Sequence, residues 1–304
     1  MQEVDLLIIG GGPAGLTAGI YACRAGLRTV LLEKMFTGGQ IVSTHKLENY
    51  PGFPEGISGV DFGLALLDQA MRFGLSVIYE DVVHIDLQPA LKVVRTASNI
   101  YGAPAVILAL GAQPRKLGVT GEETYTGRGV SYCATCDGAF YNGRSVAVVG
   151  GGDTACEDAI YLSGIAEKVT LIHRRDTLRS TGILNERVRS IPNVELMLST
   201  KVSEILGETG VTKLQLQHAG GRESTLSVDG VFIAVGTEPS TDILAGQVAL
   251  NPQGYILTDR HMTTNIPGVF AAGDVRDTVL RQVVTAAADG AIAATEAQRF
   301  LTTH

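Results

Sequence analysis

The chain alternates between short apolar runs and segments of mixed, helix-like composition. Val4–Ile9, Arg28–Leu32, Ser145–Val149 and Lys168–Ile172 are mostly apolar runs of strand length, which is typical of parallel strands buried on both faces. In each successive pair of runs, a glycine-rich turn and a predicted helix come between the two strands, as Leu16–Arg24 does in the first pair. This repeated strand–helix–strand order predicts an α/β fold.

The first turn has the sequence Gly10-Gly11-Gly12-Pro13-Ala14-Gly15 and joins a strand directly to a helix. Its glycines allow a tight turn and let the backbone approach a pyrophosphate, which the free N–H groups of the helix N-terminus would bind. Glu33 ends the next strand, where a carboxylate accepts hydrogen bonds from a ribose. The complete pattern favours a dinucleotide site for FAD or NAD over a chance glycine turn.

The second turn, Gly150-Gly151-Gly152-Asp153-Thr154-Ala155, repeats this motif with alanine at its last position. His173-Arg174-Arg175 stand where Glu33 stands in the first copy, and Arg179 follows a turn later. Guanidinium groups bind a 2′-phosphate through charge-assisted hydrogen bonds, whereas a carboxylate would repel it. This segment therefore predicts an NADP site, although Asp176 adds a negative charge nearby and a solvated charge run is the alternative.

A second similarity supports two related units. Residues 106–114 and residues 231–239 each contain a buried apolar run, then a glycine, then a proline. Because two motifs recur in the same order, the chain is predicted to hold two similar nucleotide-binding units.

The C-terminal part is predicted to return to the first unit. Residues 265–274 form a loop, a short strand and an acid, and Arg281–Leu301 is an alanine-rich predicted helix. The first domain would then be discontinuous, residues 1–115 and 241–304, and the second would be an insert, residues 116–240. Two short connections between compact domains form a natural hinge.

Composition limits the partners and the compartment. The chain has 304 residues, 45% of them hydrophobic, with a net charge of −7, which argues against nucleic acid or an anionic membrane as the main partner. Leu6–Ile9 is too short for a membrane span. The N-terminal MQEVD is acidic where a signal peptide would be basic, and four cysteines are too few for a secreted disulfide scaffold. The cytoplasm is the predicted location.

Two of the cysteines lie in SYCATCDGAF, where Cys133 and Cys136 precede Asp137. This pair could be part of a zinc site, a structural disulfide or a redox couple. A structural zinc site needs four ligands, and Cys23 and Cys156 are isolated in predicted helices, so no metal is expected. A purely structural disulfide is unusual in the cytoplasm.

Together these segments resemble the bacterial-type, low-molecular-weight thioredoxin reductases over essentially the whole chain. GGGPAGLTAGIYACRAG, GGQ, ENYPGF, SYCATCDGAF, GGGDTA, HRRDTLR and GVFAAGDV follow in that family's order. Cys156 is a small departure, since an aliphatic residue is more common there.

The resemblance implies two Rossmann-like three-layer domains, with FAD in the first and NADPH in the inserted one that carries the cysteine pair. The implied FAD contacts are Gly10, Gly12, Pro13, Ala14, Gly15, Glu33, Lys34, Gly39, Gln40, Asn49, Val82, Gly111, Gly273, Asp274, Arg281, Gln282 and Val283. The implied NADPH contacts are Gly152, Asp153, Thr154, His173, Arg174, Arg175 and Arg179.

The resemblance also implies the chemistry. Electrons would pass from NADPH through FAD to a redox-active Cys133–Cys136 disulfide, and the resulting dithiol would attack the disulfide of thioredoxin. Asp137 would handle the proton; a cap or turn role is its alternative. Cys136 would lie nearer the flavin.

Because the NADPH residues and the cysteines share one unit, the inserted domain would rotate between half-reactions, with Pro114 and Pro239 flanking the pivots. Family members are typically homodimers. Two alternative functions remain: reduction of another thioredoxin-like or peroxidase-linked protein, and a flavin-containing redox sensor with vestigial catalysis.

Overall fold

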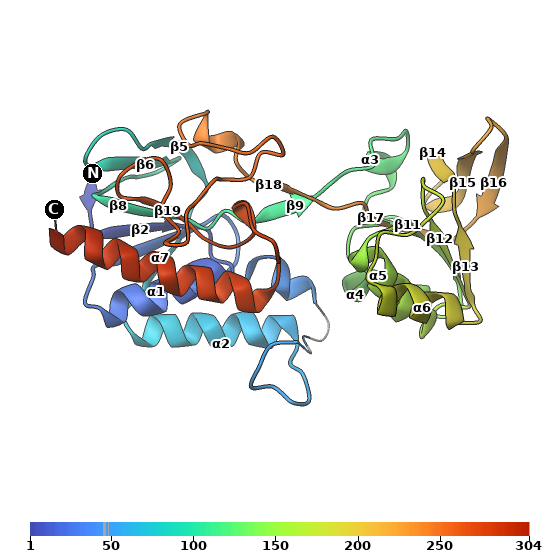
Figure 1. Ribbon diagram of the computed structural model, residues 1–304, viewed down its shortest axis with the longest axis horizontal. Helices are drawn as coiled ribbons and strands as arrows, with labels where there is room; N and C mark the ends of the chain where they lie inside the picture. The colour runs from blue at the N-terminus through green and yellow to red at the C-terminus, as the bar shows by residue number, and fades with distance from the viewer. Residues whose placement is uncertain (45–46, 48, 304) are drawn as a thin grey trace. The chain divides into compact units, whose positions relative to one another are not determined.

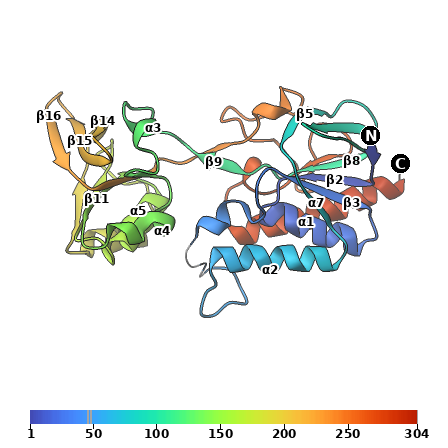
Figure 2. The same cartoon turned by 180° about the vertical axis from the view of Figure 1, so that it is seen from behind.

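The computed structural model describes residues 1–44, 47 and 49–303. The chain forms two compact α/β units (Figures 1 and 2), unit 1 from Met1–Gln113 with Glu238–His304 and unit 2 from Pro114–Thr237. The division falls earlier in both connections than residues 115 and 240, the sequence-based boundaries. It falls within the two connecting strands, β9 (Ala112–Pro114) and β18 (Thr237–Pro239), which pair with each other.

Unit 1 contains a five-stranded parallel sheet in the order β19-β8-β2-β3-β4. Its strands are β19 (Val269–Ala271), β8 (Ala105–Leu108), β2 (Leu6–Ile9), β3 (Thr29–Glu33) and β4 (Ser76–Tyr79). All residues of β2, β8 and β19 are buried, which explains their continuous apolar sequences.

The two faces of this sheet are covered differently. Leu6 and Ile8 of β2 pack with the helices, whereas Leu7 and Ile9 pack with a second sheet, as the alternation of side chains along a strand requires. The helices are α1 (Pro13–Arg24), α2 (Gly59–Arg72) and α7 (Val283–Thr303). The second sheet, in the order β1-β7-β6-β5, comprises β1 (Gln2–Glu3), β7 (Ile100–Ala103), β6 (Lys92–Thr96) and β5 (Val82–Asp86).

Two helices begin at residues other than those the sequence predicts. Helix α1 begins at Pro13, because Gly12 is its N-cap and a proline is favourable at the first helical position. Helix α7 begins at Val283 and not at residue 281. The N–H of Gln282 donates to Oγ1 of Thr285 at 3.1 Å, and the carbonyl of Gln282 accepts the first helical hydrogen bond.

Unit 2 repeats this layered plan. Its parallel sheet has the order β10-β17-β11-β12-β13. The strands are β10 (Val130–Ser131), β17 (Gly230–Ala234), β11 (Ser145–Gly150), β12 (Lys168–Ile172) and β13 (Val194–Met197). Val146 and Val148 pack toward helices, and Ala147 and Val149 pack toward an antiparallel sheet. Two Rossmann-like units are thereby confirmed.

The remaining elements of unit 2 complete its layers. The helices are α3 (Glu122–Tyr125), α4 (Ala134–Asp137), α5 (Asp153–Ser163) and α6 (Gly182–Ser190). The antiparallel strands are β14 (Thr200–Gly207), β15 (Val211–His218) and β16 (Glu223–Ser227). Short 3-10 helices across both units are η1 (Gly39–Ser43), η2 (Gly138–Tyr141), η3 (Asp242–Leu244) and η4 (Gly273–Val275). Among the described residues, no helix combines the length and apolar character needed to cross a membrane.

Candidate active site

The first glycine-rich turn packs too closely for larger residues. Gly10 has a φ of +104°, and a Cβ there would lie 2.2 Å from the carbonyl oxygen of Ala109. A Cβ on Gly15 would lie 1.9 Å from the carbonyl oxygen of Gly10. These two glycines therefore let β2, β8 and α1 meet at one point, which forms the N-terminus of α1.

The loop that begins η1 lies against this turn. Gly38 donates its N–H to the carbonyl of Gly11 at 2.7 Å, and a Cβ on Gly39 would lie 3.0 Å from the Cα of Gly12. Gln40 donates its side-chain amide to the carbonyl of Ala112. Gly39 and Gln40 are thus brought to the N-terminus of α1.

Glu33 extends from the end of β3 to the same turn. One carboxylate oxygen accepts the N–H of Gly11 at 2.7 Å, and the other accepts the N–H of Met35 at 3.2 Å. Lys34 turns away to an exposed ion pair with Asp81 at 2.8 Å. Val82 begins β5 and packs, partly buried, on the core between the two sheets.

Helix η4, which belongs to the C-terminal segment, lies beside the first glycine-rich turn. Gly273 has a φ of +77°, and a Cβ there would lie 2.9 Å from the Cβ of Ala14. A Cβ on Gly290 of α7 would lie 2.1 Å from the carbonyl oxygen of Ala14. Gly273 and Asp274 are therefore next to Ala14, although they are far from it in the sequence. Gly111, with a φ of +66°, accepts the N–H of Ser240 at 3.2 Å.

Asp274 carries a largely buried carboxyl, and Arg281 carries a buried polar atom without a hydrogen-bond partner in the described structure. Burial raises the pKa of the Asp274 carboxyl, the positive charge of Arg281 lowers it and the charge of Asp289 raises it. The Arg281 guanidinium lies 4.0 Å from the ring centre of Tyr255, yet its buried Nε has no hydrogen-bond partner in the described structure. Buried polar atoms of this kind are normally paired, so these residues fit a polar ligand such as FAD.

Asn49 and Gln282 contact each other through their side chains. The side-chain amide of Asn49 donates to Oε1 of Gln282 at 2.9 Å. Val283 follows as the first residue of α7 and packs, partly buried, on the core beneath.

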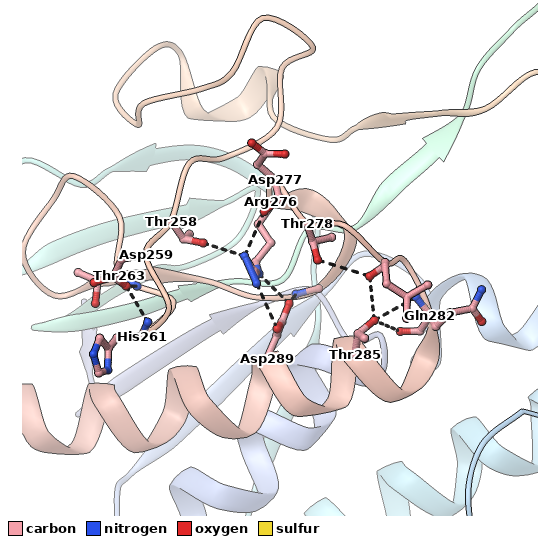
Figure 3. A network of polar contacts seen from close by, with 12 residues as sticks. Thr258, Asp259, His261, Thr263, Arg276, Asp277, Thr278, Gln282, Thr285 and Asp289 are labelled. Carbon is pink, nitrogen blue, oxygen red and sulfur yellow. Dashed lines mark hydrogen bonds and ion pairs between the residues drawn. The ribbon is translucent and has the colours of Figure 1, made fainter.

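An almost buried ion pair that the sequence did not predict lies next to Gly273 (Figure 3). Oδ2 of Asp289 accepts the N–H of Gly273 at 3.2 Å and Nε of Arg276 at 2.7 Å. Arg276 also donates to Oγ1 of Thr258 at 3.0 Å. The one signal available from the sequence is an acid within an otherwise alanine-rich helix.

In unit 2, His173 packs directly on the second glycine-rich turn. A Cβ on Gly151 would lie 2.2 Å from Nδ1 of His173, and the imidazole is buried, with no partner for Nε2 among the described residues. Burial lowers the pKa of His173, and the charges of Arg179, Arg175 and Arg174 lower it further, against a backbone hydrogen bond to Gly150. The imidazole is therefore kept neutral near neutral pH.

Three exposed arginines follow β12, and the backbone of one of them contacts this turn. Arg174, Arg175 and Arg179 are exposed, and the N–H of Arg179 donates to the carbonyl of Gly151 at 2.6 Å. A Cβ on Gly152 would meet nothing within 4 Å. Exposed guanidinium groups in a segment bonded to this turn suit the phosphate of NADPH.

The next two motif residues begin α5. Oδ1 of Asp153 accepts the N–H of Thr181 at 2.7 Å, and Thr154 is exposed. Further along α5, burial and the charge of Glu157 raise the pKa of Asp158 to about 7.

The cysteine segment leads into α4. Cys133 is disulfide-bonded, whereas Cys23 and Cys156 are free. The side chain of Cys136 lies outside the described part of the structure, so its pairing with Cys133 stays a prediction. Oγ of Ser131 accepts the N–H of Cys133 at 3.1 Å.

Asp137 ends α4 and precedes η2, to which it gives no side-chain cap. The described residues contain no group of three or more His, Cys, Asp or Glu side chains arranged to hold a metal ion.

Comparison with known proteins identifies the family. The model of the pyridine nucleotide-disulphide oxidoreductase family matches residues 4–290. A thioredoxin reductase of Listeria innocua is 46% identical over 98% of this chain and 93% of its own length, and that of Bacillus subtilis is 44% identical over 98% and 94%. The crystal structure of Lactococcus lactis thioredoxin reductase superposes with a TM-score of 0.93 at 38% identity, covering 99% of this chain and all of that one. The chain therefore belongs to the pyridine nucleotide-disulphide oxidoreductase family, among its thioredoxin reductases, and is an FAD- and NADPH-dependent enzyme.

Proposed function

We propose that the enzyme reduces the disulfide of thioredoxin with electrons from NADPH, using FAD in unit 1 and the Cys133–Cys136 pair in unit 2. The observation that carries this proposal is the state of the cysteines. Cys133 is disulfide-bonded just before α4, in the unit that holds the arginine cluster, while Cys23 and Cys156 are free thiols.

The residues of unit 1 fit FAD. Gly12 and Gly39 approach each other closely at the N-terminus of α1, whose free N–H groups would bind a pyrophosphate. Glu33 is oriented by two backbone N–H groups to accept from a ribose. Arg281 has a buried Nε to donate. A bound isoalloxazine supplies two-electron chemistry between a nicotinamide and a disulfide.

The residues of unit 2 fit NADPH. The 2′-phosphate would accept charge-assisted hydrogen bonds from Arg174, Arg175 and Arg179. The residue that directly follows β12 is His173 and not a carboxylate that would repel the phosphate. The neutral His173 beneath Gly151 would donate or accept through its unpaired Nε2.

The cysteine pair would act by thiol–disulfide exchange. One thiolate attacks a sulfur of the partner's disulfide, and a mixed disulfide forms as the partner's other thiolate leaves. The second cysteine then displaces the partner's remaining sulfur, so the pair is oxidised and the partner becomes a dithiol. Asp137 directly follows Cys136 and would supply or take up a proton at the sulfur. The β9 and β18 connections, each ending in a proline, would be the pivots of the domain rotation.

We expect the active form to be a homodimer in the cytoplasm. Val60, Leu64 and Met71 of α2 are each at least half exposed and share one face of the helix at their spacing. An apolar helix face of this kind suits a second copy of the chain. A Leu64→Arg variant that sedimented like the wild-type protein would count against α2 as the contact.

An assay of NADPH oxidation with purified thioredoxin tests the function. The wild-type enzyme should oxidise NADPH only when thioredoxin is present and regenerated by a disulfide dye. Cys136→Ser should keep bound FAD and lose thioredoxin reduction. Turnover only with a glutaredoxin-like or peroxidase-linked protein would favour that alternative partner, and bound flavin without turnover on any partner would favour a sensor.

A further inference from the structure

The buried carboxylate of Glu122 accepts a hydrogen bond from Tyr132, the residue that precedes the redox-active Cys133. The hydroxyl of Tyr132 donates to Oε1 of Glu122 at 2.7 Å, and Glu122 is only 2% exposed. Tyr132 is the immediate neighbour of Cys133 in the sequence. The hydrogen bond therefore restrains the backbone one residue from the sulfur-bearing position.

The carboxylate of Glu122 also accepts hydrogen bonds from the segment that follows β9, at the start of unit 2. Oε1 of Glu122 accepts the N–H of Leu117 at 2.7 Å, and Oε2 accepts the N–H of Gly118 at 2.6 Å. Both residues follow the connecting strand β9. Three donors thus compensate a buried charge and join the entering segment to the residue before Cys133.

Tyr132 remains a hydrogen-bond donor throughout the useful pH range. Burial raises its pKa to about 12, and the hydrogen bond and charge of Glu122 contribute to the shift. Its ring packs, with Leu117, against the core cluster that includes Val130 and Val149. Phenylalanine would keep this packing and lose only the hydroxyl.

We propose that Glu122 is a positioning residue for the redox-active pair, acting through the hydroxyl of Tyr132. The inference rests on the proposed redox role of Cys133. In the structure the Glu122–Tyr132 hydrogen bond is made while Cys133 is disulfide-bonded, so the bond restrains Cys133 in the oxidised geometry. Removal of the hydroxyl should therefore shift the pair toward the dithiol. A role in loop stability alone would leave the thiol–disulfide equilibrium unchanged.

The test uses the holoenzyme with Tyr132→Phe, equilibrated in buffers of reduced and oxidised dithiothreitol. Alkylation followed by mass measurement gives the oxidised fraction. We expect the equilibrium to move about 3- to 10-fold toward the dithiol, an effect of the size of one typical net hydrogen bond. Tyr125→Phe is the matched control, because it removes another tyrosine hydroxyl of the same cluster, which donates to the carbonyl of Gly207 at 2.6 Å.

The inference is overturned if Tyr132→Phe leaves the equilibrium within twofold of the wild-type and Tyr125→Phe proteins. Glu122→Gln, alone and combined with Tyr132→Phe, adds a second criterion. If Glu122 acts through Tyr132, the double variant should shift no further than Glu122→Gln; additive shifts would also overturn the inference. A wild-type protein without an exchangeable disulfide would instead reject the proposed function, and the inference with it.

Discussion

Asp289 of α7 forms a buried ion pair with Arg276, with 2.7 Å between Oδ2 and Nε. The same carboxylate accepts the N–H of Gly273, so it connects the C-terminal helix to the turn that carries Asp274. Because a Cβ on Gly273 would meet Ala14, this turn packs on the N-terminus of α1. The ion pair (Figure 3) thus holds the Gly273 turn against α7, beside the N-terminus of α1, where we propose that FAD binds.

Asp289→Ala should lower the free energy of unfolding by about 3–5 kcal/mol, because it leaves the largely buried charge of Arg276 without its carboxylate partner. It should also weaken FAD binding, since the Gly273 turn loses its anchor. Urea unfolding and reconstitution of the apoprotein with FAD measure the two effects. Asp277→Ala is the control: Asp277 is exposed and contacts Arg276 through its backbone carbonyl. Equal losses in the two variants would contradict the role of Asp289.

Two adjacent glycines in unit 2 should have separable roles. Gly151→Ala should destabilise the protein by about 1–3 kcal/mol, because its Cβ would overlap the imidazole of His173. Gly152→Ala should leave stability nearly unchanged, since its Cβ meets no protein atom within 4 Å, but should weaken NADPH binding by filling the space left for the nucleotide. Thermal unfolding and NADPH titration are the measurements. A Gly152→Ala protein that binds NADPH normally would show that this space is not the nucleotide site.

The basic cluster should determine the choice of nucleotide. Arg174→Ala combined with Arg175→Ala should reduce kcat/KM for NADPH by about 10- to 100-fold or more, the effect expected from lost charge-assisted hydrogen bonds. The value for NADH should change little. Arg222→Ala, an exposed arginine elsewhere in unit 2, controls for net charge. Equal losses with both nucleotides would mean that the cluster does not bind the 2′-phosphate.

Asp158 should make stability depend on pH. Its folded-state pKa of about 7 lies above the ordinary value of 3.8, so the folded protein holds this proton more tightly. Its contribution to stability is therefore complete below about pH 4 and is lost as the pH rises to about 7. Asp158→Asn should remove that slope and stabilise the protein at pH 8 by about a few kcal/mol, because each pKa unit corresponds to roughly 1.4 kcal/mol.

Urea unfolding between pH 4 and pH 8 measures this effect. Glu157→Gln should reduce the slope in part, because the charge of Glu157 contributes to the raised pKa. Parallel pH profiles for wild type and Asp158→Asn would refute the assignment.

Local motifs in the sequence predicted the sheet centres and both glycine-rich turns well. Lys168–Ile172 was predicted as a strand and is β12, because a buried parallel strand needs a continuous apolar run. Gly10 and Gly15 followed from the motif, since only glycine fits where β2, β8 and α1 meet.

Residues that act through distant partners could not be found in this way. Asp289 pairs with Arg276, and Glu122 with Tyr132, across separations that no periodicity marks. The start of α7 was also missed, because the hydrogen bond from Gln282 to Thr285 has no unique sequence signature. These side chains contact the backbone or the sequence neighbours of predicted site residues. The partners of Asp289 and Glu122 are separated from them in the sequence and become neighbours only in the folded structure.

Electron exchange between the proposed Cys133–Cys136 pair and bound FAD is the step on which the proposed function depends. Anaerobic titration of the purified protein with NADPH, followed by flavin absorbance, measures this exchange. We expect a yellow protein that takes up two hydride equivalents per subunit, one for the flavin and one for the disulfide, and only one in Cys133→Ser. Uptake of a single equivalent by the wild-type protein, or a preparation without flavin, would rule out electron exchange between the cysteine pair and FAD.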